Sequence, residues 1–345
     1  MQLHEFMLPE IVPNPPQLEE LTVEKLPSLL FVGVDPERSQ ILLNEGLFGS
    51  EDFEKGTETA SSGYKSWRRA YAFSQPFDQA QRRYFVDFED ALLMPRECYF
   101  GADFNVFQYN RRRGDRTSVL WRLPNYFEPS RGIGHPPRET KKDEIDFKDK
   151  VAKVYWRGGV SGSHWATPFK KLTTPQISPE TFNDATIQSN FSRIKLVNSY
   201  ANSRVVDAKF SGNTVDRFVA SSLRKDDITS SAVHTSEMME YRYLLCPAGN
   251  DVSSALYWII RTNSIAFKEE TAYETVPDYF LKPWVHYIPI SPGLHDIEEK
   301  FEFCENNQDY CKQVIENAQS AYSAITTTNT WVESESIVLD RLGLL

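Results

Sequence analysis

Residues 241–290 constrain the fold of this chain more than any other stretch. Tyr243–Cys246 is a short apolar run with the length of one buried strand, and a turn containing Pro and Gly ends it. From residue 252 onward, apolar side chains recur at intervals of three and four, which predicts a helix with one buried face. A second apolar run, 264–267, predicts another strand. Two strands joined by a helix form a parallel βαβ unit.

The turn between the first strand and the helix predicts a ligand site. Ligands of open α/β sheets lie beyond the carboxyl ends of the strands, where the free N–H groups of a helix start attract anions. A diphosphate would suit this loop, because a glycine without a Cβ allows close approach. In the alternative interpretation, Asp251 only caps the helix and the serines are ordinary first-turn residues. The candidate anion-binding residues are Gly249, Asn250, Asp251, Val252, Ser253 and Ser254.

Composition excludes several classes of function. The chain has 345 residues, enough for two domains that each bury a core, and its formal charge of −10 argues against general nucleic-acid binding. Its four cysteines include no C-x-x-C pair of the kind found in zinc and redox sites. We find no apolar run of about 18 residues and no secretory signal pattern. We therefore expect a cytoplasmic protein, at most in peripheral contact with the inner face of a membrane.

A stretch rich in Pro, Gly and charged residues, 128–150, divides the chain as an interdomain linker would. The first domain begins with an extended N-terminal arm, and helical character dominates 294–328. We predict an N-terminal domain over 1–135, a linker over 136–150, a second domain over 151–320, and a tail over 321–345 that packs back on the N-terminal domain.

Charged residues follow several predicted strands. The run 84–94 contains Asp87 and Asp90, and a carboxylate at the end of a strand can act as a general base, although a solvated acidic turn is equally consistent. The strand at 104–109 leads into a basic loop that would hold an anionic acceptor or lie in solvent. The strand at 151–156 leads into an arginine whose fork of donors fits phosphate oxygens. These basic residues are Arg111, Arg112 and Arg113 in the first loop, and Arg157, followed by Gly158, in the second.

Four segments together resemble glycosyltransferase family 90. They are VYWRGG, RIKLVNSYANSRVVDAKFSG, YRYLLCPAGNDVSSALYWIIRTNSIAF and LKPWVHYIPI, and the resemblance extends over about 151–320. It implies an α/β fold of GT-B-like architecture, with two Rossmann-like domains facing a central cleft and the donor bound to the second. It also implies inverting transfer of glucose, xylose or galactose from a UDP-sugar to a hydroxyl of a glycan or lipid-linked glycan, in lipopolysaccharide, capsule or other surface-glycan synthesis.

The resemblance assigns roles to individual residues. The family's Arg-Gly-Ser segment matches Arg157 and Gly158, with a glycine in place of the serine, and its next arginine matches Arg193. Its catalytic aspartate best matches Asp90, with Asp87 as the second candidate. This aspartate would deprotonate the acceptor hydroxyl as that oxygen attacks the anomeric carbon.

The predicted loop after the second strand of the βαβ unit offers further contacts. In that loop, Tyr273 and Glu274 would contact the base and ribose of the donor. Basic side chains and the helix dipole would offset the diphosphate charge, so we expect no obligatory divalent ion and no other cofactor. Ile194 and Ala255 replace an acidic residue and a donor-loop arginine of Rumi-type members, which argues against Rumi-type protein O-glucosylation.

Two other classes of function stay open at this point. A non-catalytic nucleotide-sugar-binding protein of the same fold would bind UDP without transferring the sugar. An NAD-dependent oxidoreductase would need a G-x-G-x-x-G pattern after the first strand, and PAGNDVSS lacks it.

Overall fold

The computed structural model describes residues 1–8, 31–35, 40–43, 46–49, 84–87, 106–115, 118–122, 142–165, 171–172, 178–211 and 228–345. The chain divides into two compact units. The first comprises Met1–Arg138, Tyr273–Phe280 and Ala324–Leu345, and the second comprises Glu139–Ala272 and Leu281–Ser323.

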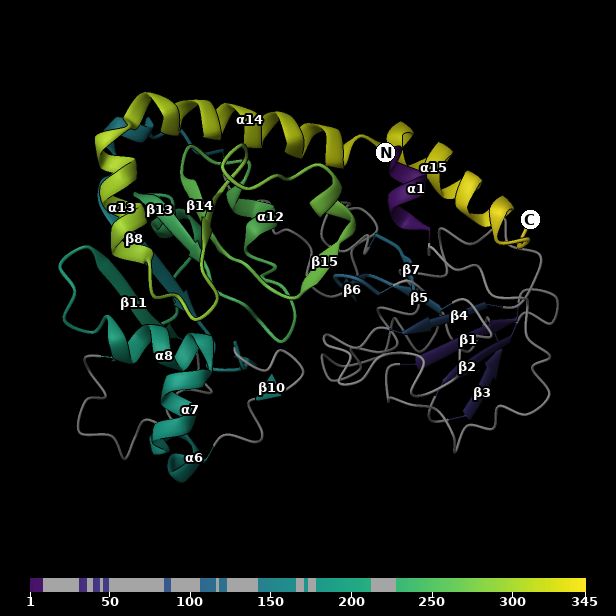
Figure 1. Cartoon of the computed structure of the whole chain (residues 1–345), viewed down its shortest axis with the longest axis horizontal. Helices are drawn as coiled ribbons and strands as arrows, with labels where there is room; N and C mark the ends of the chain where they lie inside the picture. The colour runs from purple at the N-terminus through teal and green to yellow at the C-terminus, as the bar shows by residue number, and fades with distance from the viewer. Residues whose placement is uncertain are drawn as a thin grey trace. The chain divides into compact units, whose positions relative to one another are not determined.

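A six-stranded parallel sheet forms the centre of the second unit (Figure 1). In the order of the chain its strands occupy positions 3-2-1-4-5-6, the strand order of a doubly wound nucleotide-binding fold. The order reverses between β8 and β13. In spatial order the strands are β12 (Thr229–Ser230), β11 (Val206–Ser211), β8 (Val151–Gly158), β13 (Tyr241–Cys246), β14 (Ile265–Glu269) and β16 (Ile288–Ile290).

Both faces of this sheet are buried. Val154 and Trp156 of β8 point to one face and share a core with residues of α8 and α13. Tyr155 and Leu244 point to the other face and are buried as well. Burial on both faces explains why these strands read as nearly continuous apolar runs.

The smaller elements of the second unit surround this sheet. They include a two-stranded sheet of β9 and β10 and a 3₁₀ turn, η3, ahead of β8. The helical prediction over 294–328 is confirmed by α13 and α14. The elements are η3 (Phe147–Asp149), β9 (Gly162–Ser163), β10 (Lys171–Leu172), α6 (Pro179–Asn183), α7 (Ala185–Asn190), α8 (Ser192–Ser199), α11 (Thr235–Met238), α12 (Leu256–Ile259), α13 (Ile297–Asn306) and α14 (Gln308–Thr326).

The two strands of the predicted βαβ unit are confirmed, and its helix is shorter than predicted. β13 and β14 pair in parallel, with Tyr243 opposite Ile265. The helix, predicted from residue 252, is the single turn of α12, and residues 251–255 form turns. The Ser253 carbonyl accepts the N–H of residue 256 three positions on, at 3.2 Å. Asp and Ser compete with the helical backbone for hydrogen bonds, so an apolar period alone overestimates helix at this position.

Residues 142–150, which we assigned to the linker, are packed into the second unit. Phe147 belongs to its core. The Nζ atom of Lys150 lies 2.8 Å from Oδ2 of Asp143, and the two side chains are 0% and 3% exposed. Asp143 Oδ2 also accepts the N–H of Asn263 at 2.8 Å. This stretch is therefore anchored ahead of β8 and does not behave as a free connector.

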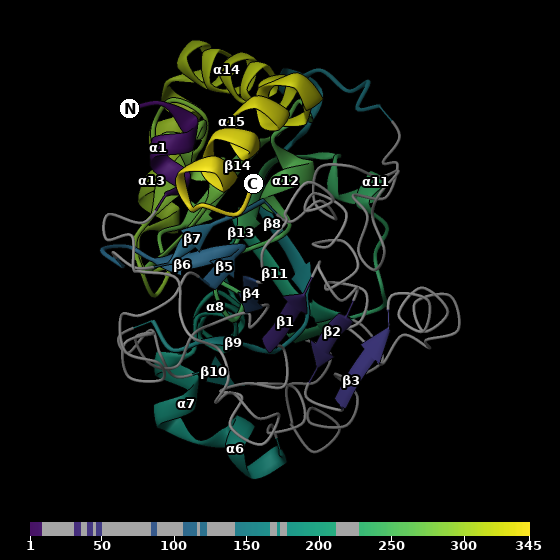
Figure 2. The same cartoon turned by 90° about the vertical axis from the view of Figure 1, so that its right-hand side faces the viewer.

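The described part of the first unit contains a mixed six-stranded sheet. The strands β3, β2, β1 and β4 pair in antiparallel fashion, whereas β4, β5 and β7 pair in parallel. Figure 2 shows these strands in the order β3-β2-β1-β4-β5-β7. Their bounds are β1 (Phe31–Asp35), β2 (Gln40–Leu43), β3 (Gly46–Gly49), β4 (Tyr84–Asp87), β5 (Val106–Gln108) and β7 (Val119–Leu120).

A second ladder and two helices complete the first unit. β6 (Asn110–Arg112) pairs in antiparallel fashion with β15 (Tyr273–Thr275), and the 3₁₀ helix η5 (Val276–Tyr279) follows. The helix α1 (Leu3–Met7) lies beside α15 (Thr328–Arg341) (Figures 1 and 2). Within the described ranges, we find no helix whose length and hydropathy would let it cross a bilayer.

Candidate functional site

Two loops of the second unit meet at the point where the strand order reverses. One follows β8 and the other follows β13. The N–H of Ser163 donates to the carbonyl of Gly249 at 2.7 Å, and the Ser163 hydroxyl donates to the carbonyl of Asn250. A Cβ on Gly162 would lie 3.3 Å from the carbonyl oxygen of Ala248. The loops are therefore in direct contact at the carboxyl edge of the sheet, where open α/β folds bind ligands.

Arg193, in the first turn of α8, lies against both loops. Its Nη1 donates to the carbonyl of Gly159 at 3.4 Å. A Cβ on Gly249 would lie 3.4 Å from its Nη2. One guanidinium thus contacts the loop after β8 and approaches the loop after β13.

The charge of Arg193 has no ion-pair partner among the described residues. Its Nε is buried without a hydrogen-bond partner, although the side chain as a whole is partly exposed. Burial lowers the pKa of Arg193 to about 10, and the charges of Glu269 and Asp251 oppose that shift. The guanidinium therefore stays positive at neutral pH, with donors available for an anion such as phosphate.

Glu269, the last residue of β14, binds the loop after β13 and the start of α8 through hydrogen bonds. It was not predicted from the sequence. Its carboxylate is 2% exposed and accepts hydrogen bonds from three segments. The signal in the sequence is an acidic residue at the end of a strand that begins with three apolar residues. That signal also fits a solvated strand end, so it could not have identified the residue alone.

Arg157 and Gly158, both predicted to bind the donor, have structural partners within the second unit. Arg157 Nη2 lies 2.7 Å from Oδ1 of Asp207, and its guanidinium carbon lies 4.2 Å from the centre of the Tyr155 ring. The Trp156 ring fills the space beside Gly158, where a Cβ would lie 2.6 Å from that ring. Arg157 is therefore already engaged with a carboxylate, in contrast to Arg193.

The loop after β13 contains the predicted donor residues 249–254. A Cβ on Gly249 would lie 2.7 Å from the carbonyl of Val252, so the tight turn requires glycine. Asp251 and Ser253 are buried, and Ser254 is exposed. Asn250 and Val252 lie between these extremes. Asp251 does not cap a helix at residue 252, because the helix starts at residue 256, so the capping alternative is also wrong.

Tyr273 and Glu274 lie in the first unit, on strand β15 and not in the predicted loop. Tyr273 is buried, and Glu274 Oε1 lies 2.7 Å from the Nε of Arg111. We predicted a basic loop over 111–113, but Arg111 and Arg112 lie on strand β6. Arg111 also donates to the carbonyls of residues 6, 8 and 118. Arg113 is 45% exposed and lies 3.8 Å from Glu274.

One of the two candidate general bases, Asp87, lies in β4. Asp87 is its last residue and is buried. It pairs in register with Phe31 on one side and Gln108 on the other. Asp90 lies outside the described residues.

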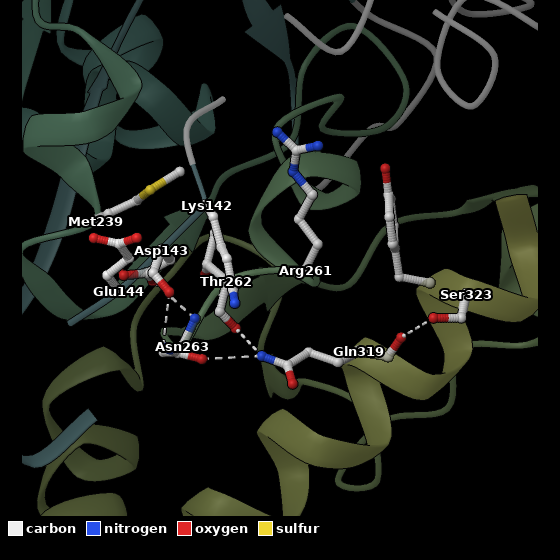
Figure 3. A pocket seen from close by; sticks show the side chains of 10 residues that line it. Lys142, Asp143, Glu144, Met239, Arg261, Thr262, Asn263, Gln319 and Ser323 are labelled. Atoms are coloured by element: carbon white, nitrogen blue, oxygen red, sulfur yellow. Dashed lines mark hydrogen bonds between the residues drawn. The ribbon is translucent and has the colours of Figure 1, made fainter. Parts of the chain in front are cut away.

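A cavity of about 730 Å³ lies at the opposite edge of the parallel sheet, where the strands begin. Figure 3 shows Asn263 hydrogen-bonded to Asp143 and to Gln319, with Arg261 extending away from this group. None of the described residues that line the cavity is a predicted site residue. The cavity is thus separate from the candidate site at the loop edge beside Arg193.

The strand order defines a doubly wound α/β protein, and the loop edge beside Arg193 is its candidate anion-binding site. The family model described as glycosyl transferase family 90 matches residues 138–326, more than half of the 345 residues. The chain belongs to this family, as the four sequence segments indicated.

Curated relatives agree with the family. O-glucosyltransferase LpsA of Dichelobacter nodosus is 31% identical over 104 residues, which cover 30% of this chain and 33% of the relative. Protein O-glucosyltransferase 1 of Rattus norvegicus is 29% identical over 255 residues, 66% of this chain and 61% of the relative. Uncharacterized protein 035R of Invertebrate iridescent virus 3 is 42% identical over 62 residues, 18% of this chain and 5% of the relative. The matches thus span less than two thirds of each relative.

Proposed function

We propose that this protein transfers a sugar from a UDP-sugar to a hydroxyl group of a glycan acceptor. The observation that carries the proposal is Arg193, a positive group without an ion-pair partner among the described residues, at the carboxyl edge of a sheet with the strand order of nucleotide-binding folds. Membership of glycosyl transferase family 90 supports sugar transfer as the reaction. Two of the relatives are named O-glucosyltransferases, so glucose is the first donor sugar to test, before xylose and galactose.

In this proposal the donor diphosphate lies against the loops after β8 and β13. Negative charge grows on the diphosphate as the bond to the sugar breaks, and a fixed positive group beside it stabilises that charge. Arg193 supplies this group. Arg157 acts less directly, because it already pairs with Asp207.

An aspartate that acts as general base completes the proposed reaction. Asp90, or Asp87 as the second candidate, removes the proton from the acceptor hydroxyl while the oxygen attacks the anomeric carbon. The nucleotide leaves from the opposite side, so a single displacement inverts that carbon. A GT-B-like arrangement, with two Rossmann-like domains facing a cleft, is part of this proposal.

The acceptor is proposed to be a glycan or lipid-linked glycan of surface-glycan synthesis, such as a lipopolysaccharide or capsule precursor. Such an acceptor would bring a cytoplasmic enzyme into peripheral contact with a membrane. The test is transfer of labelled sugar to isolated glycan precursors and to an unmodified protein domain. Labelling of the protein domain alone would contradict this part.

We also propose that transfer needs no divalent ion, because Arg193 can offset the diphosphate charge. We expect the rate in excess EDTA to lie within about twofold of the rate with Mg²⁺ or Mn²⁺. Loss of activity in EDTA, with recovery on adding Mn²⁺, would contradict it.

A donor screen tests the central proposal. The protein is incubated with UDP-glucose, UDP-xylose, UDP-galactose and, as a control, GDP-mannose, and melting temperature and slow hydrolysis are measured. We expect one UDP-sugar to raise the melting temperature and to be hydrolysed, and Arg193→Ala to abolish both effects. Binding without hydrolysis or transfer would indicate the non-catalytic nucleotide-sugar-binding alternative. No response to any nucleotide sugar would refute the proposal.

A further inference from the structure

The carboxylate of Glu269 joins three segments at the ligand edge of the second unit. Its Oε1 accepts the hydroxyl of Ser192 at 2.7 Å and the N–H of Gly293 at 2.9 Å. Its Oε2 accepts the N–H of Ala248 at 2.7 Å. Three donors on a buried carboxylate favour its charged form. Burial acts in the opposite direction and raises the pKa of Glu269.

Two of the three donors directly precede residues of the candidate diphosphate site. Ser192 directly precedes Arg193 in the first turn of α8. Ala248 directly precedes Gly249 in the loop after β13. The third donor lies in the loop after β16. One side chain therefore fixes both parts of the candidate diphosphate site relative to each other.

Glu269 also affects Arg193 without forming a direct ion pair with it. The negative charge of Glu269 favours the protonated guanidinium. Its two oxygens are already occupied by Ser192, Ala248 and Gly293. A direct bidentate pair would occupy the donors of the arginine. Here the arginine keeps its charge, and its donors stay available for a ligand.

We infer that Glu269 is a positioning residue for the donor diphosphate, which it serves by fixing the loop after β13 and the start of α8 around an available Arg193. This inference rests on the proposed function of the site. Glu269 touches neither the sugar nor the phosphates in this account.

The variant Glu269→Gln separates this role from simple space filling. An amide has one acceptor oxygen and one NH₂ group. In one orientation the NH₂ faces the N–H of Ala248, and in the other it faces the N–H of Gly293. Neither orientation satisfies both backbone donors, so one loop must move.

The experiment compares Glu269→Gln with Glu335→Gln. Glu335 is a matched control, because it is also a buried glutamate with charged hydrogen bonds, but it lies in the first unit and binds Arg122. UDP affinity is measured by calorimetry well below the melting temperature of each variant. We expect Glu269→Gln to weaken UDP binding at least about tenfold and Glu335→Gln to change it less than about twofold.

The sign of the effect discriminates between two roles. If the carboxylate acted only as a negative charge near the phosphates, its removal would tighten UDP binding. Tighter or unchanged binding in Glu269→Gln would therefore overturn the inference. If Glu269→Gln fails to fold, Ser192→Ala replaces it, since that variant removes one donor and keeps the charge. We expect about threefold weaker binding for Ser192→Ala, and unchanged binding would overturn the inference as well.

Hydrogen exchange separates failure of this inference from failure of the proposed function. We expect faster amide exchange at 247–250 and 291–294 in Glu269→Gln than in wild type, without ligand, and no such change in Glu335→Gln. If wild type does not bind UDP, the proposed function fails, and exchange alone decides the role of Glu269. Unchanged exchange in both loops would overturn that role.

Discussion

Arg193 and Arg157 carry the same charge, but their surroundings differ. The resemblance assigned both residues to the donor, whereas the structure engages Arg157 with Asp207 and leaves Arg193 without an ion pair among the described residues. We predict that Arg193→Ala weakens UDP binding at least about tenfold, because a hydrogen bond to a charged group contributes roughly 1.5–3 kcal/mol. Arg157→Ala should lower stability more than affinity. Calorimetric titration with UDP measures the affinity of each variant, and thermal unfolding measures its stability. A larger loss of UDP affinity in Arg157→Ala than in Arg193→Ala would contradict the assignment.

The two candidate general bases, Asp87 and Asp90, differ in what the structure describes. Asp87 is buried in the sheet, and Asp90 lies outside the described residues. We predict that Asp90→Asn lowers the transfer rate at least about a hundredfold, since a general base contributes 10²–10⁴-fold, and leaves the UDP dissociation constant within about twofold. Asp87→Asn serves as the comparison. Full turnover in Asp90→Asn with loss of turnover in Asp87→Asn would reverse their roles.

Sequence reasoning at the scale of single residues depended on what lies nearby in the chain. The family pattern pointed to Arg193 and Gly249, and the structure brings them together. It did not point to Glu269, because that role depends on partners 77, 21 and 24 positions away. Tyr273 and Glu274 looked like loop residues for a similar reason, since β15 pairs with a strand about 160 positions earlier.

At the scale of elements, the parallel strands were predictable and the connecting helix was not. Runs such as Tyr243–Cys246 are apolar on both faces, which is typical of a buried parallel strand. The helix prediction relied on the apolar spacing from residue 252 onward. Asp251, Ser253 and Ser254 favour turns at the start of this stretch, and the helix begins only at residue 256.

The anchor of residues 142–150 gives a prediction at this scale. Lys150→Met would leave the buried carboxylate of Asp143 without its cation, so we expect a loss of roughly 3–5 kcal/mol in unfolding free energy. Lys148 lies in the same segment and is exposed, and Lys148→Met should change stability by less than about 0.5 kcal/mol. Urea denaturation measures both. Equal stability of the two variants would mean that this pair does not anchor the segment.

At the scale of the whole molecule, the first unit is assembled from three separate stretches of the chain. Residues 273–280 belong to it, although they lie within the second domain that we predicted over 151–320. A boundary drawn along the sequence cannot express such an assembly. Composition could indicate the division near 136–150 but not the return of the chain to the first unit.

The buried pair of Arg122 and Glu335 gives a prediction about the two units. Arg122 is 2% exposed, and its guanidinium carbon lies 5.2 Å from the centre of the Trp331 ring. We predict that Glu335→Ala lowers the melting temperature of the first unit, because it leaves that cation buried, and spares the second unit. Calorimetry should then resolve two unfolding transitions, and UDP should raise only the transition of the second unit. A single transition that shifts as a whole would contradict separate unfolding of the two units.

The most direct test of the account is a crystal structure of the protein with UDP. We predict phosphate oxygens within hydrogen-bonding distance of the Arg193 guanidinium, against the loops after β8 and β13. UDP bound elsewhere, for example in the cavity beside Arg261 at the opposite edge of the sheet, would contradict it.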